Sequence, residues 1–398
     1  MKPFIALAII VLLACSHIAG TSVHVAQPAP AASKFAFRLY DKLLKQDPNT
    51  NVFVSPTSIS FALAMTYNGA GGKTREAMAR VLDIEGLTLD EVNNAFANLQ
   101  RGPAPADPKV QLNIANSLWT RKGITFKPDF LQRARQHYDA TVTTLNFDDP
   151  RAPDAINDWV KQKTNNLIDS IVDRISSDKI LFLINAIYFK GQWKEEFEKA
   201  KTKQAPFHLL NGQQKEVPLM TQTGKYVYFE DKDFQAVSLP YGTGRVSMYV
   251  FLPASNTTLA DFQKTITSEN WENWMSRFRI TPGTIMLPRF EVTYEANLNE
   301  ALKAIGMAEA FDPMGADFSG MMNTGERVYI SEVKHKAFAQ INEEGTKAAA
   351  VTSVGVSTTS VTIEPKPFVM RVDRPFFFAI RDNANGALLF MGSVVDPQ

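Results

Sequence analysis

The stretch EEGTKAAAVTSVGVSTTSVT, residues 343–362, is a long segment with the composition of a buried β-strand. Two acids and a glycine lead into residues that are nearly all small, β-branched or hydroxylated. The segment contains no proline, and after the two acids its only charged residue is Lys347. Such residues pack well in a sheet and nothing in the segment would block ladder hydrogen bonds, which raises the question of why the chain carries it.

The regions on both sides of this stretch also have strand character. Apolar and β-branched runs flank it at 327–342 and 367–394, and Asn385-Gly386 is a hairpin signal. Further strand-like runs lie at 110–118, 140–147, 180–189, 226–229, 235–241, 245–252 and 285–294. Helical periodicity marks the earlier part of the chain, near Ser33, from the cap Ser55-Pro56 to Gly69, and at 74–82 and 152–168. Early helices and late strands without a linker predict an α+β fold in one continuous domain.

The composition argues against several classes of partner. The chain has 398 residues, of which 45% are apolar and 27 are phenylalanine, enough for a large core. The formal net charge is +1 and no basic run stands out. The sequence therefore gives no indication of nucleic acid or an acidic membrane as the main partner.

The N-terminus, residues 1–20, has the features of a secretory signal. Lys2 supplies the positive charge, and Phe4 to Ala14 is an unbroken apolar run that is too short to span a bilayer as a helix. We expect residues 21–32, which are rich in Pro and Ala, to form a tether before a folded domain at 33–398. These features predict an exported protein.

The single cysteine leaves the final location open. Cys15 ends the sequence LLAC, which resembles the bacterial lipobox, in which the cysteine is lipidated and becomes the N-terminus of an envelope lipoprotein. The alternative is an ordinary signal, cleaved after Ala19-Gly20, and a secreted protein without a lipid anchor. With either signal the folded part has no thiol, which excludes disulfides and cysteine catalysis.

No pattern typical of an enzyme active site is found. The histidines beyond the signal are scattered without metal-ligand spacing at His24, His137, His208 and His335. The sequence GAGGKT at 69–74 lacks the glycine that a phosphate loop needs five residues before the GK pair, because Tyr67 occupies that place. We therefore expect a protein that is not an enzyme and that holds no metal or cofactor.

Six stretches, in order, give the chain its resemblance to the serpin family over residues 33–397. They are NVFVSPTSIS (51–60), FLINAIYFKGQWKEEF (182–197), VSLPYGTGRVSMYVFLP (237–253), LPRFEVTY (287–294), KHKAFAQINEEGTKAAA (334–350) and DRPFFFAIRDNANGALLFMGSVVDP (373–397). The resemblance implies about nine helices packed on three mainly antiparallel sheets, with an exposed reactive-centre loop at 343–366. It also implies a monomer whose partner is a serine protease, bound as a covalent acyl-enzyme.

In this family a target protease attacks the loop as a substrate, and the cleaved loop then inserts as a new strand into a large central sheet. About fifteen residues at roughly 3.3 Å each would form a strand near 50 Å long. Insertion carries the acylated protease to the opposite pole of the inhibitor before the ester hydrolyses. A loop of small residues makes this insertion inexpensive, whereas proline or an unpaired charge would oppose it.

The resemblance assigns roles to individual residues. The hinge of the loop corresponds to Glu343, Glu344, Gly345, Thr346, Ala348, Ala349 and Ala350. The breach, where insertion begins, corresponds to Trp193, Arg289 and Glu343, and we expect a partly buried ion pair between Arg289 and Glu343. The shutter, a polar cluster beneath the point where the sheet parts, corresponds to Ser55, Ser58, Asn185 and His335.

The usual family spacing, fourteen residues onward from Gly345, places the reactive bond at Thr359-Ser360. Thr358 and Ser360 are the alternative specificity residues. A small β-branched residue fits the shallow primary pocket of elastase-like serine proteases. The competing interpretation is that 353–362 is a linker and that the bond lies elsewhere.

Three functions remain open at this stage. The first is irreversible inhibition of serine endopeptidases, which the proline-free hinge favours. The second is a non-inhibitory serpin that acts as a carrier or storage protein, and this protein would form no complex stable in SDS. The third is inhibition of cysteine proteases, which the composition of the loop permits equally.

Overall fold

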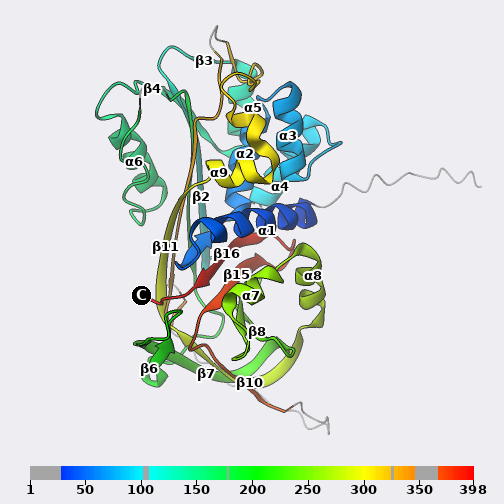
Figure 1. Cartoon of the computed structure of the whole chain (residues 1–398), viewed down its shortest axis with the longest axis vertical. Helices are drawn as coiled ribbons and strands as arrows, with labels where there is room; N and C mark the ends of the chain where they lie inside the picture. The colour runs from blue at the N-terminus through cyan, green and yellow to red at the C-terminus, as the bar shows by residue number, and fades with distance from the viewer. Residues whose placement is uncertain (1–27, 102–106, 177–178, 324–326, 346–365) are drawn as a thin grey trace, which may run out of the picture.

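The structure is a computed structural model that describes residues 28–101, 107–176, 179–323, 327–345 and 366–398. Figure 1 shows an elongated molecule in which a sheet of long strands runs along one side. Helices α2 to α5 gather beside one end of this sheet, and the strands β6, β7 and β10 lie at the other end. The termini of the long strands therefore lie at opposite poles of the molecule.

Nine α-helices occur among the described residues, which confirms the expected number. They are α1 (Pro28–Gln46), α2 (Pro56–Tyr67), α3 (Gly72–Leu82), α4 (Leu89–Arg101), α5 (Pro128–Tyr138), α6 (Ala152–Lys163), α7 (Leu259–Lys264), α8 (Ser268–Arg277) and α9 (Asn299–Leu302). Three short helical turns accompany them: η1 (Lys199–Lys201), η2 (Lys303–Met307) and η3 (Ala308–Phe311).

The described strands form three sheets, as expected. The nine-stranded sheet has the order β1 (Val52–Val54), β16 (Leu388–Val394), β15 (Phe376–Asp382), β9 (Val246–Pro253), β8 (Phe234–Pro240), β7 (Gln214–Glu230), β10 (Arg279–Pro288) and β14 (Phe368–Arg371), with β6 (Lys203–His208) beside β7. The five-stranded sheet has the order β11 (Phe290–Asn297), β13 (Glu332–Ile341), β5 (Leu181–Gly191), β2 (Val110–Arg121) and β4 (Thr141–Leu145). The third pairs β12 (Met322–Asn323) with β3 (Thr125–Phe126).

Most strand pairs are antiparallel, and the exceptions matter for function. The parallel pairs are β10 with β14, β2 with β4, and β13 with β5. The pair β13 and β5 lies in the middle of the five-stranded sheet, where each strand has an antiparallel neighbour on its other side. This parallel pair is the only central one in that sheet among the described strands.

Helix α2 contacts strands of both large sheets, and its start is fixed by local sequence. The Ser55 side chain caps the helix by accepting a hydrogen bond from the backbone N–H of Ser58, and Pro56 follows in the first turn. Every residue of α2 is buried. A helix that is buried on all sides holds its cap at a fixed place in the interior, which positions the polar residues at its start.

The apolar interior has two parts, one on each face of the five-stranded sheet. The main core joins helices α1 to α5 to the sheets. A smaller cluster lies between α6 and the sheet, and it includes Trp119, Ile156, Val160, Phe182 and Ile184. Figure 1 shows α6 on the side of the long strands opposite to α2. The five-stranded sheet is thus covered on both faces.

Several boundaries differ from those expected. Helix α1 begins at Pro28, inside the expected tether 21–32, because proline is tolerated in a first helical turn and alanine is a strong helix former. The expected strand at 285–294 is two strands in different sheets, β10 and β11, separated at Arg289. Helix α6 ends at Lys163 rather than near 168, where Asn165 and Asn166 adopt positive φ angles. The hairpin at Asn385-Gly386 is confirmed by the antiparallel pairing of β15 and β16.

Candidate functional site

The two central parallel strands separate at one end. Strands β13 and β5 are in register from Glu332 and Phe182 to Phe338 and Tyr188. Beyond this point, the register pairs residues 339–341 with β11 and residues 189–191 with β2. The direct pairing of the two strands therefore ends three residues before their C-terminal ends.

A tight turn closes β13 at this opening. The N–H of Gly345 donates to the carbonyl of Asn342 at 3.1 Å, and the two residues form an antiparallel bridge. Gly345 has a φ of +90°, and a Cβ atom at this position would lie 2.4 Å from the carbonyl oxygen of Gly191. Only glycine fits here without moving backbone. The turn therefore reverses the chain between Asn342 and Gly345.

Trp193 holds the turn from the side of β5. Its indole Nε1–H donates to the carbonyl of Asn342 at 2.8 Å, and its backbone N–H donates to the carbonyl of Glu344 at 3.1 Å. The ring is buried and stacks on Tyr241 with centroids 4.3 Å apart. The indole N–H and the backbone N–H of Trp193 are both directed at the turn and fix it against the end of β5.

The hinge carboxylates have different partners. Glu343 is buried, with an exposed fraction of 5%, and accepts a hydrogen bond from the Thr202 hydroxyl at 2.8 Å. Its ion pair with Arg289 has an N–O distance of 3.7 Å, and Arg289 itself is half-exposed. The ion pair expected from the sequence is therefore present but long, and Thr202 is the closer partner. Glu344 pairs instead with Lys199 at 2.5 Å, on the exposed side of the turn.

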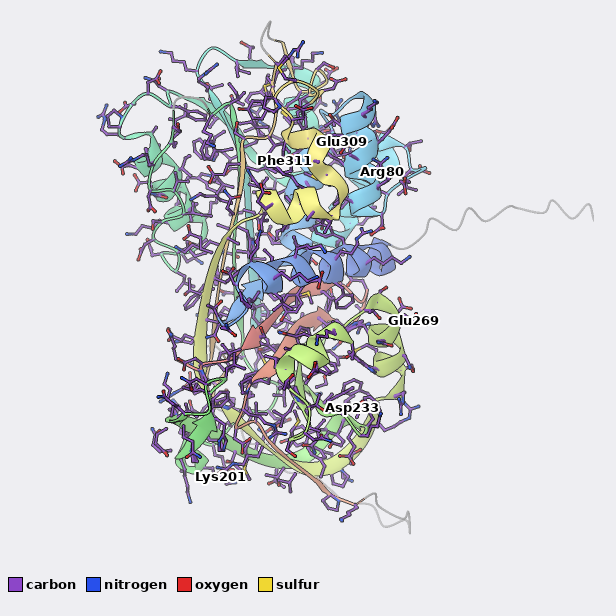
Figure 2. The ribbon with its side chains drawn as sticks, viewed as in Figure 1. Arg80, Lys201, Asp233, Glu269, Glu309 and Phe311 are labelled. Carbon is purple, nitrogen blue, oxygen red and sulfur yellow. The ribbon has the colours of Figure 1, made fainter. Side chains whose placement is uncertain are left out.

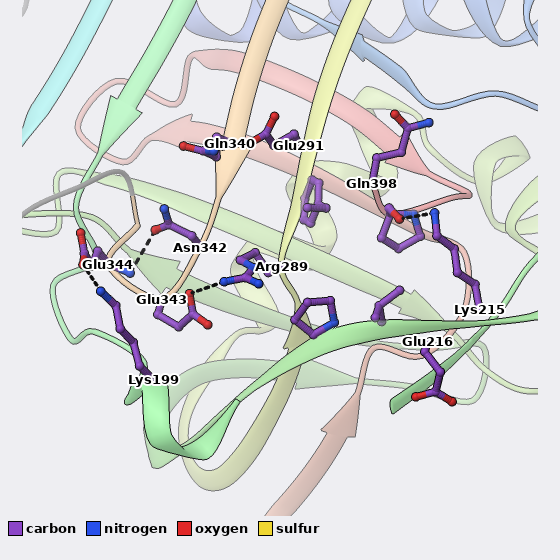
Figure 3. Close-up of a pocket in the computed structure, with 14 residues that line it drawn as sticks. Lys199, Lys215, Glu216, Arg289, Glu291, Gln340, Asn342, Glu343, Glu344 and Gln398 are labelled. Carbon is purple, nitrogen blue, oxygen red and sulfur yellow. Dashed lines mark hydrogen bonds and ion pairs between the residues drawn. The ribbon is translucent and has the colours of Figure 1, made fainter. Parts of the chain in front are cut away.

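The hinge side chains open into a pocket of about 550 Å³. Figure 3 shows Glu343 directed toward Arg289, and Glu344 toward Lys199, at one side of this pocket. Lys215 lies on the other side, near Gln398. Its ammonium group forms an ion pair with the Asp396 carboxylate, with an N–O distance of 2.7 Å. Each of these cations already has a carboxylate partner. The pocket thus belongs to the hinge rather than forming a separate charged site.

The four residues expected at the shutter lie in one hydrogen-bonded cluster, and all are fully buried. His335 on β13 accepts a hydrogen bond from the N–H of Ser55 at its Nε2, and its Nδ1 lies 2.6 Å from the Asn185 Oδ1 on β5. The Asn185 Nδ2 donates to the Ser58 hydroxyl at 2.5 Å. The cluster therefore crosses from β13 to β5 and continues to the start of α2.

Sequence reasoning missed two members of this cluster. The Asn185 Nδ2 also donates to the Asn116 Oδ1 on β2 at 2.5 Å, and the Ser55 hydroxyl donates to the carbonyl of Leu389 at 2.6 Å. Asn116 and Asn185 are direct cross-strand partners. The cluster thus ties three strands of the five-stranded sheet to α2 and, through Leu389, to the nine-stranded sheet.

Burial determines the protonation state of His335. Desolvation lowers the pKa of His335 to about 3, because the charged imidazolium would lie in the apolar interior. A neutral imidazole has one donor and one acceptor nitrogen. Since Nε2 accepts from the Ser55 N–H, Nδ1 carries the proton and donates to Asn185. The neutral His335 therefore links β13 to Asn185 on β5 and to Ser55 at the start of α2.

Several predicted residues lie outside the described part of the chain. They are the hinge residues Thr346, Ala348, Ala349 and Ala350, the expected reactive bond Thr359-Ser360, and Cys15. Within the described ranges no group of three or more His, Cys, Asp or Glu side chains could hold a metal ion. No helix in those ranges is both long enough and apolar enough to cross a bilayer.

Comparison with known proteins gives one consistent family. The family model of serpins, serine protease inhibitors, matches residues 30–397. The human leukocyte elastase inhibitor is 33% identical over 93% of this chain and 100% of its own length. The native state of the thermophilic serpin Tengpin is 33% identical, with a TM-score of 0.84 over 92% of this chain and 94% of that one. Human thyroxine-binding globulin complexed with thyroxine is 25% identical, with a TM-score of 0.83 over 94% of this chain and 99% of that one.

Proposed function

This chain belongs to the serpin family, and from that premise we propose that it is an irreversible suicide-substrate inhibitor of serine endopeptidases. The observation that carries the proposal is the turn at Asn342–Gly345. It reverses the chain where the pairing of β13 and β5 ends, and a strand inserted there would lie between two parallel strands and run antiparallel to both. A strand added there would replace one parallel pair by two antiparallel pairs.

Strand addition at this place is favourable on simple grounds. A strand of about fifteen residues gains a hydrogen-bonded neighbour on each side, and at about 1 kcal/mol for each net hydrogen bond the gain is on the order of 10 kcal/mol. The sequence from Thr346 to Thr352 adds only small or β-branched side chains apart from Lys347. Alternation directs Thr346, Ala348 and Ala350 inward and Lys347 to solvent.

The shutter cluster supports the proposal because it lies where the sheet would have to part. The bond from Asn185 to His335 spans β5 and β13, the two strands that a new strand would separate. Insertion must break this bond, and a buried polar group without a partner costs about 1–3 kcal/mol. The cluster therefore resists opening until a cleaved loop supplies compensating pairs.

We propose an elastase-like target and the reactive bond Thr359-Ser360. Two observations support this choice: the small β-branched Thr359, and the relatives that are named leukocyte elastase inhibitors. We also propose export, directed by residues 1–20, with either a lipid on Cys15 or cleavage after Gly20. The mass of the mature N-terminus after expression in a bacterial host distinguishes these two outcomes.

The proposal is tested by incubation with pancreatic elastase. We expect a complex stable in SDS and, after denaturation, a C-terminal peptide that begins at Ser360 or one residue to either side. Cleavage of the loop should raise the melting temperature by at least about 10 °C. This shift follows from dividing the stabilisation of about 10 kcal/mol by the usual unfolding entropy of a domain of this size. A nicked protein that melts like the intact one would show that no strand is added, and would favour a carrier such as the hormone-binding relative.

A matched pair of variants separates insertion from recognition. Thr346→Arg places a charge on the inward face and should convert the inhibitor into a substrate, which raises the ratio of inhibitor consumed per protease trapped. Lys347→Glu changes a charge at the neighbouring outward position and should leave this ratio unchanged. Equal ratios for both variants would contradict the alternation on which the mechanism depends. Papain in the same assay tests whether the protein also inhibits cysteine proteases.

A further inference from the structure

One ion pair of the hinge involves a residue that sequence reasoning did not identify. Lys199, in the helical turn η1, pairs with the Glu344 carboxylate at 2.5 Å. We propose that Lys199 is a positioning residue for inhibition, because this ion pair keeps the turn at residues 342–345 in the form that insertion of the cleaved loop requires. The inference rests on the proposed inhibitory function and adds to it a residue that holds the hinge.

The segment that carries this lysine, residues 193–202, is itself attached to the nine-stranded sheet. The Gln222 side chain on β7 donates to the carbonyl of Glu196 at 2.7 Å. At the start of the segment, the N–H of Lys194 donates at 2.8 Å to the carbonyl of Pro240, the last residue of β8. These bonds make residues 193–202, called the clasp below, a fixed support beside the turn.

The clasp holds both the backbone and the side chains of the turn. The N–H of Phe197 donates to the carbonyl of Glu343 at 2.9 Å, in addition to the two bonds from Trp193 described above. Lys199 extends this hold to the Glu344 side chain, and Figure 3 shows the ammonium group and the carboxylate directed toward each other. The turn is therefore fixed to the clasp at two consecutive residues, Glu343 and Glu344.

The shape of the turn is the one that strand insertion needs. A strand inserted between β13 and β5 would run antiparallel to β13, so the chain must reverse directly after β13. The bridge between Asn342 and Gly345 supplies this reversal before the loop is cut. A turn that is ordered beforehand costs no conformational entropy when insertion starts, so insertion is faster than from a freely moving hinge.

Faster insertion favours the inhibitory outcome. After attack on the loop, insertion competes with hydrolysis of the acyl-enzyme ester, and hydrolysis releases the protease and leaves a spent inhibitor. The ion pair acts on this competition by a modest amount, because the Lys199 side chain is 70% exposed and that of Glu344 is 22% exposed. Salt weakens a pair of this kind. The hold on the hinge therefore depends on ionic strength.

The test compares Lys199→Met with Lys201→Met in the otherwise unchanged protein. Lys201 is the matched control because it also belongs to η1 and pairs with Glu198 at 2.7 Å, and Figures 1 and 2 show it at the end of the molecule where β6 lies. The measured quantity is the number of inhibitor molecules consumed per molecule of pancreatic elastase trapped. Its excess over one measures ester hydrolysis relative to insertion. We expect this excess to rise about two- to fivefold for Lys199→Met, as for the loss of an exposed ion pair, and to stay at the wild-type value for Lys201→Met.

Salt and a charge exchange distinguish the ion pair from a general effect of the substitution. At about 1 M NaCl the wild-type excess should approach that of Lys199→Met, because the screening length falls to about 3 Å, whereas the excess of the variant should change little. Lys199→Glu should raise the excess further, and the protein that combines Lys199→Glu with Glu344→Lys should return it toward the wild-type value. The melting temperature of Lys199→Met should stay within about 2 °C of the wild type.

Each result supports or refutes the role of Lys199. An unchanged excess in Lys199→Met, or an equal rise in Lys201→Met, would overturn this role and leave the proposed function intact. A fall in the excess would show that the ion pair delays insertion, which also contradicts the proposal. A charge exchange that restores nothing would show that the pairing of these two charges does not hold the turn. If the wild-type protein forms no complex stable in SDS, the proposed function fails first, and this inference fails with it.

Discussion

Replacement of His335 by glutamine should remove a specific part of the acid sensitivity of this protein. His335 is fully buried and neutral, and it bridges Asn185 and the Ser55 N–H. Its pKa is about 3 in the folded chain, whereas the ordinary value in an unfolded chain is about 6.5. Glutamine also has one donor and one acceptor group but does not titrate in this range.

The magnitude follows from proton linkage. A histidine with a lower pKa in the folded state takes up a proton on unfolding, so stability falls as the pH drops through 6.5 and continues to fall until about pH 3. Between pH 7.5 and pH 5.0 these two pKa values give a loss of about 2 kcal/mol. For a domain of about 370 residues, with the usual unfolding entropy per residue, this corresponds to 2–3 °C in melting temperature.

The assay is thermal unfolding at pH 7.5 and pH 5.0, followed by circular dichroism. The fall in melting temperature between the two pH values should be about 2–3 °C larger for the wild type than for His335→Gln. Contributions from the carboxylates cancel in this difference. His208→Gln is the matched control because it removes an exposed imidazole on β6, and it should behave like the wild type. An identical pH dependence in all three proteins would refute the conclusion that His335 is neutral in the folded protein.

Two further predictions concern the hinge and the cover of the sheet. Gly345→Ala should lower the melting temperature by several degrees and release the turn, because the added Cβ would lie 2.4 Å from the Gly191 carbonyl oxygen. Gly212 has a similar φ angle, but a Cβ there would meet nothing within 4 Å, so Gly212→Ala should lower the melting temperature much less. Lys336→Met should speed hydrogen exchange at the amide of Ile171, because Lys336 donates to the neighbouring carbonyl of Ser170 at 2.7 Å and holds this segment over the sheet. An unchanged exchange rate there would show that the segment is held by other contacts.

Local signals in the sequence predicted the parts of the site that depend on local structure. The cap Ser55-Pro56 was sufficient to place the start of α2, and the structure has the same cap. Helix α4 was missed although its signal was available. Thr88 and Glu91 form a reciprocal capping box, in which each side chain accepts a hydrogen bond from the backbone N–H of the other.

Other features depend on contacts between distant segments and could not be predicted from one sequence. Thr202 donates a hydrogen bond to the Glu343 carboxylate, but the two residues are 141 positions apart in the chain, so only the tertiary fold brings them together. Asn116 joins the shutter because the register of β2 and β5 sets it opposite Asn185. Most of β7 was also missed, since only 226–229 has the expected apolar character and its first half is largely polar.

The place of β15 and β16 has a consequence for the protein after proteolysis. A cut at the expected bond divides the chain in two, yet the later piece contributes both strands to the interior of the nine-stranded sheet, between β9 and β1. Its side chains Phe377, Phe378 and Phe390 are fully buried. Scission would therefore convert a single polypeptide into a non-covalent heterodimer whose subunit interface is the former hydrophobic core, and the small subunit would separate only when the whole molecule unfolds.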